Sequence, residues 1–221
     1  FDRVGRRITL TAFGQEVLVR ARRLVADADA LKQTGKGMHA GLMGSLRIGL
    51  SSAPGALLAT PLMLHMTEHH PMLQVQISRG HTELLVYELR AQHLDAAIVD
   101  VRSLRPAADI VVAQVFELEA GFLVRPGHPL IERGGPVRFA ELLAYPVAST
   151  PLSDEVARLL IGRYGPQANP DNLVTLRSDE TLNLVEVARR SNAIVLTVNA
   201  AADDLLRLPV VPALDATARF G

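Results

Sequence analysis

The sequence contains no cysteine among its 221 residues, so it can form neither a disulfide framework nor a thiolate metal site. Its 23 lysines and arginines balance 23 aspartates and glutamates, and this zero net charge excludes a global basic field of the kind that attracts nucleic acid. No run of 18 or more apolar residues occurs, and no signal-peptide pattern opens the sequence. We therefore expect a soluble, cytoplasmic protein with no membrane partner.

Motifs of catalysis and phosphate binding are also missing. No glycine-rich loop of the Walker or dinucleotide type occurs. Residues 49–53 (Gly-Leu-Ser-Ser-Ala) lack the second glycine of a serine-hydrolase elbow, and the spacing identifies no base. His65 and His69 belong to an H-x-x-E-H motif, but it ends next to His70 and Pro71 and has no third ligand. We expect a solvated histidine face there, and no enzyme, cofactor or metal.

Positive charge is concentrated at the start of the chain. Residues 1–23 hold six arginines and only two acidic residues. A short β-ribbon that lies along a DNA duplex needs cations at its tip, so we expect Arg3, Arg6 and Arg7 to contact phosphates. The arginines at positions 20, 22 and 23 are explained equally well by a solvated helix face.

A long amphipathic helix is predicted to follow from Thr11, which can act as its N-cap. Apolar residues then recur at steps of four, three, four and three, the a/d seam of a coiled coil. The seam residues are Val17, Ala21, Leu24, Ala28 and Leu31. The alternative is an amphipathic helix that packs on its own domain. Four glycines, at positions 35, 37, 41 and 44, are expected to break the helix and form a hinge.

The rest of the chain alternates between β and α patterns in two series of similar size. The first series has strands at 46–50, 73–79 and 96–99 and helices at about 56–69 and 83–92. After an irregular stretch rich in glycine and proline, the second has strands at 121–124, 145–148, 174–178 and 193–198 and helices at 153–163, 180–190 and 200–206. This alternation predicts mostly parallel sheets covered by helices, in two lobes with a seam near residues 115–118.

Short motifs along the whole chain are similar to those of LysR-type transcriptional regulators. Residues 1–14 resemble the stretch that closes the family's winged helix-turn-helix, with a phenylalanine, spaced arginines, Leu-Thr and a glycine. The body shows four further matches in the family's order: G-x-L-R-I-G at 44–49, His-Pro at 70–71, L-D-x-x-I at 94–98 and His-Pro-Leu at 128–130. The chain is identified on these motifs as a member of that family.

The resemblance implies an α/β fold with two Rossmann-like lobes like those of a type 2 periplasmic binding protein, preceded by a wing remnant and a long linker helix. The implied divisions are 1–10 (end of the winged helix-turn-helix), 11–44 (linker helix and hinge), 45–115 and 116–212 (the two effector-binding lobes) and 213–221 (return towards the first lobe). The recognition helix that precedes the wing is expected to be absent. The sequence departs from the family pattern in two places. Relatives have glycines and then a proline around the last strand of the second lobe, where this sequence has Arg189 to Ala193 and Val198. The sequence also ends at Gly221, before the final strand and helix that the family pattern leads us to expect.

Ligands of open parallel sheets lie beyond the carboxyl ends of the strands, where helices begin. That rule, with the resemblance, predicts a small-molecule site formed by Ser51, Ser52, His81, Thr82, Asp100, Thr150, Thr197 and Val198. Serine and threonine also cap helices whatever the function, so capping alone is the alternative for these positions. Helix N-termini favour an anion, and a protonated His81 would add to this, whereas Asp100 suits a hydroxyl or an amine. Strand alternation allows the nearby Arg79 and Arg102 to face away.

The predicted function is that of a DNA-binding transcriptional regulator controlled by a small anionic effector held between the lobes. Its expected partners are double-stranded DNA, the effector and further copies of the chain, in a dimer or tetramer paired through the seam. The alternative is a free-standing solute-binding protein of the transport type, which would leave the basic arm unexplained. An enzyme built on the same lobes is a third possibility and lacks a catalytic set.

Overall fold

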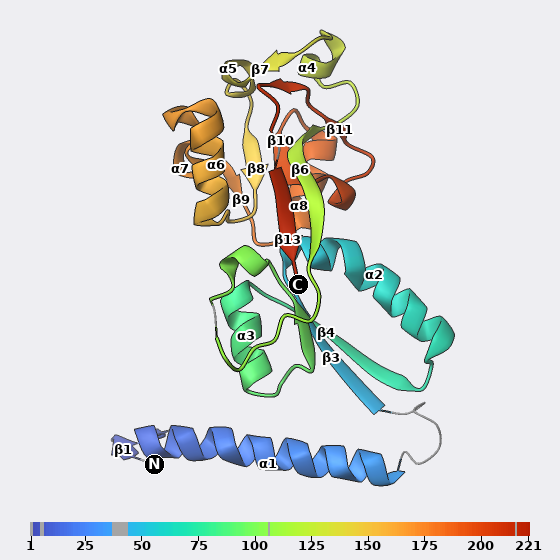
Figure 1. Ribbon diagram of the computed structural model, residues 1–221, viewed down its shortest axis with the longest axis vertical. Coiled ribbons are helices and arrows are strands. Elements are labelled where there is room, and N and C mark those ends of the chain that lie inside the picture. Colours follow the sequence, from blue (N-terminus) through green and yellow to red (C-terminus); the bar gives the residue numbers. More distant parts are fainter. Residues whose placement is uncertain (1, 5–6, 37–43, 106, 215) are drawn as a thin grey trace.

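The computed structural model describes residues 2–4, 7–36, 44–105, 107–214 and 216–221. Figure 1 shows two lobes stacked along the long axis of the molecule and a long helix that lies beyond the first lobe. Arg6, Gly37 and Gly41, for which the sequence makes predictions, lie outside the described residues. The structure confirms the expected α/β body and the helical arm in front of it.

The arm begins with a ribbon of two antiparallel strands, β1 (Asp2–Val4) and β2 (Arg7–Thr9). Helix α1 (Ala12–Lys36) follows. Thr11 is its N-cap, as predicted, because the Thr11 hydroxyl accepts a hydrogen bond from the Gly14 N–H at 2.9 Å. The helix continues through Gly35, so the expectation that this glycine breaks it is wrong: one glycine costs about 1 kcal/mol, which a long helix tolerates.

The predicted seam of α1 faces solvent. Val17 is 45% exposed and Leu24 70%, and Ala21 and Ala28 are exposed as well. Leu31 continues the spacing within α1, but its side chain lies outside the description. These apolar side chains are not buried within their own chain, which argues against the alternative of a helix packed on its own domain. Their role in dimerisation stays a prediction.

The first lobe is a parallel sheet with the strand order β4-β3-β5. Its elements are β3 (Gly44–Leu50), α2 (Ser52–His69), β4 (Leu73–Arg79), α3 (Thr82–Arg90), β5 (Ala96–Ile98) and the 3₁₀ turn η1 (Val101–Ser103). The bounds of β4 are those predicted from its alternating pattern. Helix α2 starts four residues earlier than predicted, because a proline in the first turn of a helix, here Pro54, needs no N–H partner.

The second lobe has a mixed sheet with the order β11-β6-β10-β8-β9, in which β13 also pairs with β6. Strands β8, β9 and β10 are parallel, but β6 is antiparallel to β10, β11 and β13, so the expectation of a mostly parallel sheet is wrong for this lobe. The predicted helix at 200–206 is also wrong: a 3₁₀ turn and strand β11 occupy these residues. The bounds are β6 (Phe116–Val124), α4 (Pro129–Glu132), β7 (Val137–Arg138), α5 (Phe139–Leu142), β8 (Val147–Ser149), α6 (Asp154–Tyr164), η2 (Pro166–Ala168), α7 (Pro170–Leu173), β9 (Leu176–Arg177), α8 (Thr181–Arg190), β10 (Ile194–Val198), η3 (Asn199–Ala201), β11 (Leu206–Arg207), β12 (Val210–Val211) and β13 (Ala216–Phe220).

Two neighbouring antiparallel strands, β6 and β13, extend from the second lobe to its boundary with the first (Figure 1). The described chain therefore includes a final strand, contrary to the expectation that it stops before one. After β13, the Gly221 N–H and carbonyl exchange hydrogen bonds with the Val99 carbonyl and N–H at 3.1 and 3.0 Å. The rings of Phe116 and Phe220 also meet at the boundary, with centroids 5.7 Å apart. The lobes are thus joined by a two-stranded connection.

Each lobe has its own core. The largest cluster lies in the second lobe and includes Phe122, Phe139 and Leu160. The core of the first lobe is smaller and is centred on Leu85 and Leu94. Gly49 lets these two leucines pack on β3, since a Cβ at this position would lie 2.7 Å from one and 2.9 Å from the other. Among the described helices, none is both long and apolar enough to cross a membrane.

Candidate functional site

A cleft of about 900 Å³ lies between the lobes, where the carboxyl ends of the strands of both lobes meet. All of the residues that the sequence assigns to a ligand site line this one cleft: Ser51, Ser52, His81, Thr82, Asp100, Thr150, Thr197 and Val198. The structure thus brings together side chains that are up to 147 positions apart, since they run from Ser51 to Val198. Their role in binding stays a prediction.

Four helices begin at the cleft: α2, α3, α6 and α8. Ser51 precedes α2 and His81 precedes α3, yet neither side chain makes a capping hydrogen bond. Capping therefore does not account for Ser51, which is buried, 7% exposed, and lines the cleft. Helix N-termini carry partial positive charge and free N–H groups, so these uncapped ends are suited to an anion or another hydrogen-bond acceptor.

One edge of the cleft is closed by contacts between α2 and α8. The Ser52 hydroxyl lies 2.7 Å from the Thr181 hydroxyl and accepts the Thr181 N–H at 2.9 Å. The side chain of the N-cap residue Glu180 makes no capping bond, and Ser52 of the first lobe serves instead as a cap from across the cleft. Ser52, which the sequence assigned to ligand binding, thus also joins the two lobes, a role that the sequence did not suggest.

Arg79 strengthens the same edge. Its guanidinium donates to the Ser52 carbonyl oxygen at 3.0 Å and to the Glu180 carboxylate at 2.9 Å. Gly55 makes this position possible, since a Cβ there would lie 2.1 Å from Arg79 Cζ. Arg79 is the last residue of β4, so it stands at the carboxyl end of the strand and faces the cleft, although alternation allowed it to face away.

A second ion pair crosses the cleft between η1 and α6. Arg102 Nε lies 3.3 Å from Glu155 Oε1, but this buried Nε has no partner with hydrogen-bond geometry. The Arg102 side chain is 13% exposed and also lines the cleft. Asp100 holds the turn that carries it: its carboxylate accepts the Arg102 N–H at 3.0 Å and the Ser103 hydroxyl at 3.3 Å. Asp100 therefore already has partners from its own turn.

Sequence reasoning named Arg79 and Arg102 as nearby without assigning them to the site, and it missed Glu155, Glu180 and Thr181. The strand-end rule could have found Arg79, because it closes a strand whose bounds were predicted correctly. Thr181 begins a predicted helix after a predicted strand, and the same rule covers it. No local pattern could have identified the pairs, because each joins residues more than 50 positions apart.

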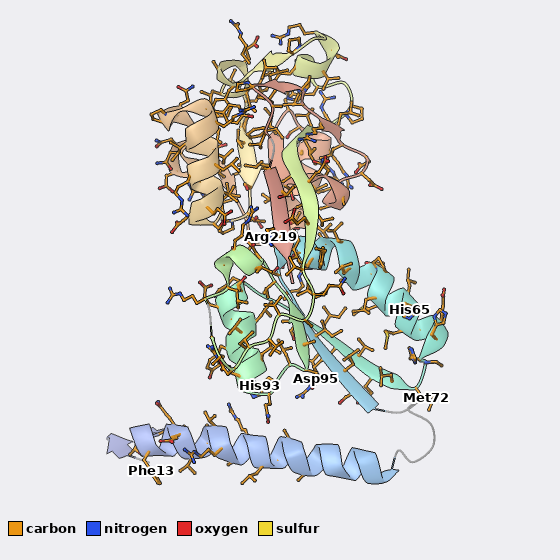
Figure 2. All side chains as sticks on the ribbon, viewed as in Figure 1. Phe13, His65, Met72, His93, Asp95 and Arg219 are labelled. Carbon is orange, nitrogen blue, oxygen red and sulfur yellow. The ribbon has the colours of Figure 1, made fainter. Side chains whose placement is uncertain are left out.

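The remaining sequence candidates lie away from the cleft. The His65 and His69 rings stack with centroids 4.3 Å apart, and Figure 2 shows His65 near the end of α2 that is remote from the second lobe. Among the described residues, no group of three or more histidine, cysteine or acidic side chains is placed to hold a metal. Arg3 and Arg7 pair with residues of the opposite strand in the β1–β2 ribbon, and their side chains lie outside the description.

This fold, with two α/β lobes joined by two strands and a cleft at the strand ends, defines a ligand-binding domain of the periplasmic-binding-protein type. The family model for the LysR substrate binding domain matches residues 39–219. The chain belongs to this family.

Curated relatives are named as transcription factors. The SDS degradation transcriptional activation protein of a Pseudomonas strain is 32% identical over 183 residues, which cover 80% of this chain and 60% of that protein. The regulator DgdR of Burkholderia cepacia is 28% identical over 228 residues, covering all of this chain and 72% of the relative. The regulator GbpR of Azospirillum brasilense is 27% identical over 65% of this chain and 42% of its own length.

Solved structures share the fold at lower sequence identity. Full-length OxyR from Pseudomonas aeruginosa superimposes with a TM-score of 0.67 and 16% identity, covering all of this chain and 72% of OxyR. Full-length CbnR in complex with its target DNA gives a TM-score of 0.64 and 17% identity, with 97% of this chain and 75% of CbnR covered. Both matches extend over the arm as well as the lobes.

Proposed function

We propose that the chain is the ligand-sensing part and linker arm of a LysR-type transcriptional regulator of the cytoplasm. A small-molecule effector binds in the cleft between the lobes. The observation that carries this proposal is the convergence of four helix N-termini and eight polar or small side chains, predicted from the sequence, on one cleft. Family membership and the names of the relatives support it.

The arm supplies the link to DNA. Arg3 and Arg7 lie in the β1–β2 ribbon and Arg6 precedes Arg7 in the sequence, and we propose that all three contact phosphates beside a DNA-binding head. The exposed apolar seam of α1 would pair with a second copy of the chain to form a homodimer or homotetramer. The structure of CbnR with its target DNA, which matches this chain over the arm and the lobes, supports a link between the arm and DNA.

Regulation would follow from the contacts that cross the cleft. The Ser52–Thr181, Arg79–Glu180 and Arg102–Glu155 contacts hold the lobes in the observed orientation. A ligand that binds one lobe orientation more tightly than another shifts the balance between them. The arm that precedes β3 would carry that shift towards the DNA-binding part.

An anionic effector suits the helix N-termini, although six acidic side chains and three arginines line the cleft. Glu180 and Glu155 are paired with arginines, and Asp100 is held within its own turn. Glu83 and Asp154 lie in the first turns of α3 and α6, where the helix dipoles offset their charge. Asp179 is the sixth acidic residue and disfavours an acid beside it, so we propose that the acid group lies near the arginines.

Two other classes of function are less well supported. A free-standing solute-binding protein would share the lobes but have no use for an arm with an exposed seam, and the curated relatives named above are regulators. An enzyme would need a nucleophile, a base and a place for the reacting atom. Neither the sequence motifs nor the relatives indicate such a set, so we propose a non-catalytic role.

A thermal-shift screen tests the proposal. The purified protein is screened with small organic acids, amino acids, sulfonates and alkyl sulfates, and a ligand should raise the melting temperature. The same ligands are tested on Thr150→Phe, which places a ring in the cleft, and on Thr67→Phe, a matched change on the exposed side of α2. Loss of the shift in Thr150→Phe alone supports the proposal. A shift that persists in Thr150→Phe places the ligand elsewhere and overturns it.

A further inference from the structure

The cleft has one polar and one apolar side. The polar side consists of the strand ends and the helix N-termini of both lobes. The apolar side belongs to the second lobe, where the inner face of α6 meets β10 and β13. Its large members are Leu152, Val156, Leu159, Leu196, Leu214 and Phe220. Three of these side chains are buried and the other three are half-buried against the second-lobe core, so a ligand group that reaches them meets a mainly hydrocarbon surface.

Small side chains make room beside these larger ones. Ala216 of β13 pairs directly with Ala120 of β6, and Ala218 lies two residues further along β13 on the same face. All of these alanines line the cleft. Because alanine ends at its Cβ atom, no long side chain projects from these positions of the sheet, and the cleft lining includes Ala216 and Leu214 of the second-lobe core. The lining beside these alanines is mainly apolar and suits a hydrocarbon group.

A cation stands at one end of this apolar side. Arg102 is largely buried and is paired with only Glu155, without hydrogen-bond geometry at its Nε. Glu155 is 55% exposed and can turn towards water, which would release the guanidinium for another acceptor. On α6, Leu159 lies one turn beyond Glu155 on the same face of the helix. The charged group and the apolar wall are therefore adjacent.

We infer that the cleft binds an amphipathic organic acid, whose acid group pairs with Arg102 and whose alkyl or aryl part lies between α6 and β13. The inference rests on the proposed function, in that the cleft is the effector site, and it adds the chemical class of the effector. A cleft of about 900 Å³ is at the upper end of the usual range for small-molecule sites, about 300 to 1,000 Å³. It suits a ligand of this size better than a two-carbon or three-carbon acid.

Calorimetric titration with a graded series of ligands tests the inference on the unmodified protein. Butyrate, hexanoate, octanoate and decanoate differ only in chain length, and octanol and octylamine replace the head group. Each buried methylene should strengthen binding about fourfold until the apolar side is filled. Octanol and octylamine should bind at least about tenfold more weakly than octanoate, because they cannot form a charged pair with Arg102.

Two variants locate the parts of the ligand. In Arg102→Met the protein should no longer bind octanoate more tightly than octanol, but its affinity should still rise with chain length. Arg190→Met, a matched change at an exposed arginine, should alter neither property. In Ala218→Leu the affinity should stop rising at a shorter alkyl chain than in the unmodified protein. Ala144→Leu, at an exposed position outside the cleft lining, is the control and should not change this limit.

The outcomes separate this inference from the proposed function. If a short polar acid or an amine binds as tightly as octanoate, and Thr150→Phe still abolishes that binding, the chemical class is wrong and the cleft remains the effector site. If octanoate binds equally well to Ala218→Leu and Thr150→Phe, it does not occupy the cleft and the inference fails. If no compound of the broader screen binds in a way that depends on Thr150, the proposed function itself fails.

Discussion

The contact between Ser52 and Thr181 gives a sharp test of how the lobes are held together. Ser52→Ala removes the oxygen that accepts the Thr181 N–H at 2.9 Å and faces its hydroxyl at 2.7 Å. Thr181 is 1% exposed, so its polar groups lose their partner where water has little access. Loss of an N-cap costs about 1 kcal/mol, and an unsatisfied buried donor costs about 1 to 3 kcal/mol. If the lobes move slightly apart in the variant, water can reach the Thr181 N–H and reduce this penalty. We therefore expect the free energy of unfolding to fall by about 1 to 2 kcal/mol.

Denaturant unfolding and amide hydrogen exchange measure this effect. Ser153→Ala is the matched control, because Ser153 caps α6 within a single lobe through the Val156 N–H at 3.5 Å. Both variants should lower the free energy of unfolding, but only Ser52→Ala should accelerate exchange of the Thr181 amide, by about tenfold for each 1.4 kcal/mol of lost protection. Unchanged exchange at Thr181 in Ser52→Ala would refute the proposed cap across the cleft.

Three further predictions concern other parts of the molecule. Gly55→Ala should break the Arg79–Glu180 pair by a clash with the guanidinium, while the gain in helix propensity of about 1 kcal/mol offsets a similar loss; a crystal structure that keeps the pair would contradict this. Burial lowers the pKa of His128 below its usual 6.5, so the unfolded chain binds more protons and the free energy of unfolding should fall as the pH drops below 6.5. Urea midpoints measured between about pH 7.5 and 5.5 should therefore depend less on pH in His128→Gln than in the unmodified protein, and an equal dependence in the two would count against this. Leu24→Glu should weaken self-association by about tenfold or more by placing a charge in the seam, as seen by sedimentation, whereas Gln15→Glu should not; an unchanged mass removes the seam assignment.

Local patterns predicted the first lobe well. The alternation Leu73, Val75, Ile77 gave the bounds of β4, and the position before Pro71 predicted the end of α2. These features depend on residues close together in the sequence. The strand-end rule then assembled the cleft lining, because in a parallel sheet the carboxyl ends of all strands lie on one side.

Pairing between distant segments limited the prediction of the second lobe. Strand β11 has only two residues and exists because Leu206 pairs with Val124 of β6, which no local pattern reveals. The antiparallel pairing of β13 with β6 joins segments about 100 positions apart, so the sequence suggested a parallel sheet and no final strand. The place of Arg102 in the cleft was left open for the same reason, since its partner Glu155 comes from the other lobe.

The distance between the lobes with and without ligand tests the central claim most directly. Because the sequence has no cysteine, spin labels can be placed at Glu68→Cys in the first lobe and Arg138→Cys in the second, both at exposed positions. Arg138→Cys with Arg163→Cys is a control pair within the second lobe. Octanoate, or the acid of the screen that binds most tightly, should shift the distance distribution of the first pair and leave the control pair unchanged. Saturating binding with no change in the first pair would contradict the account.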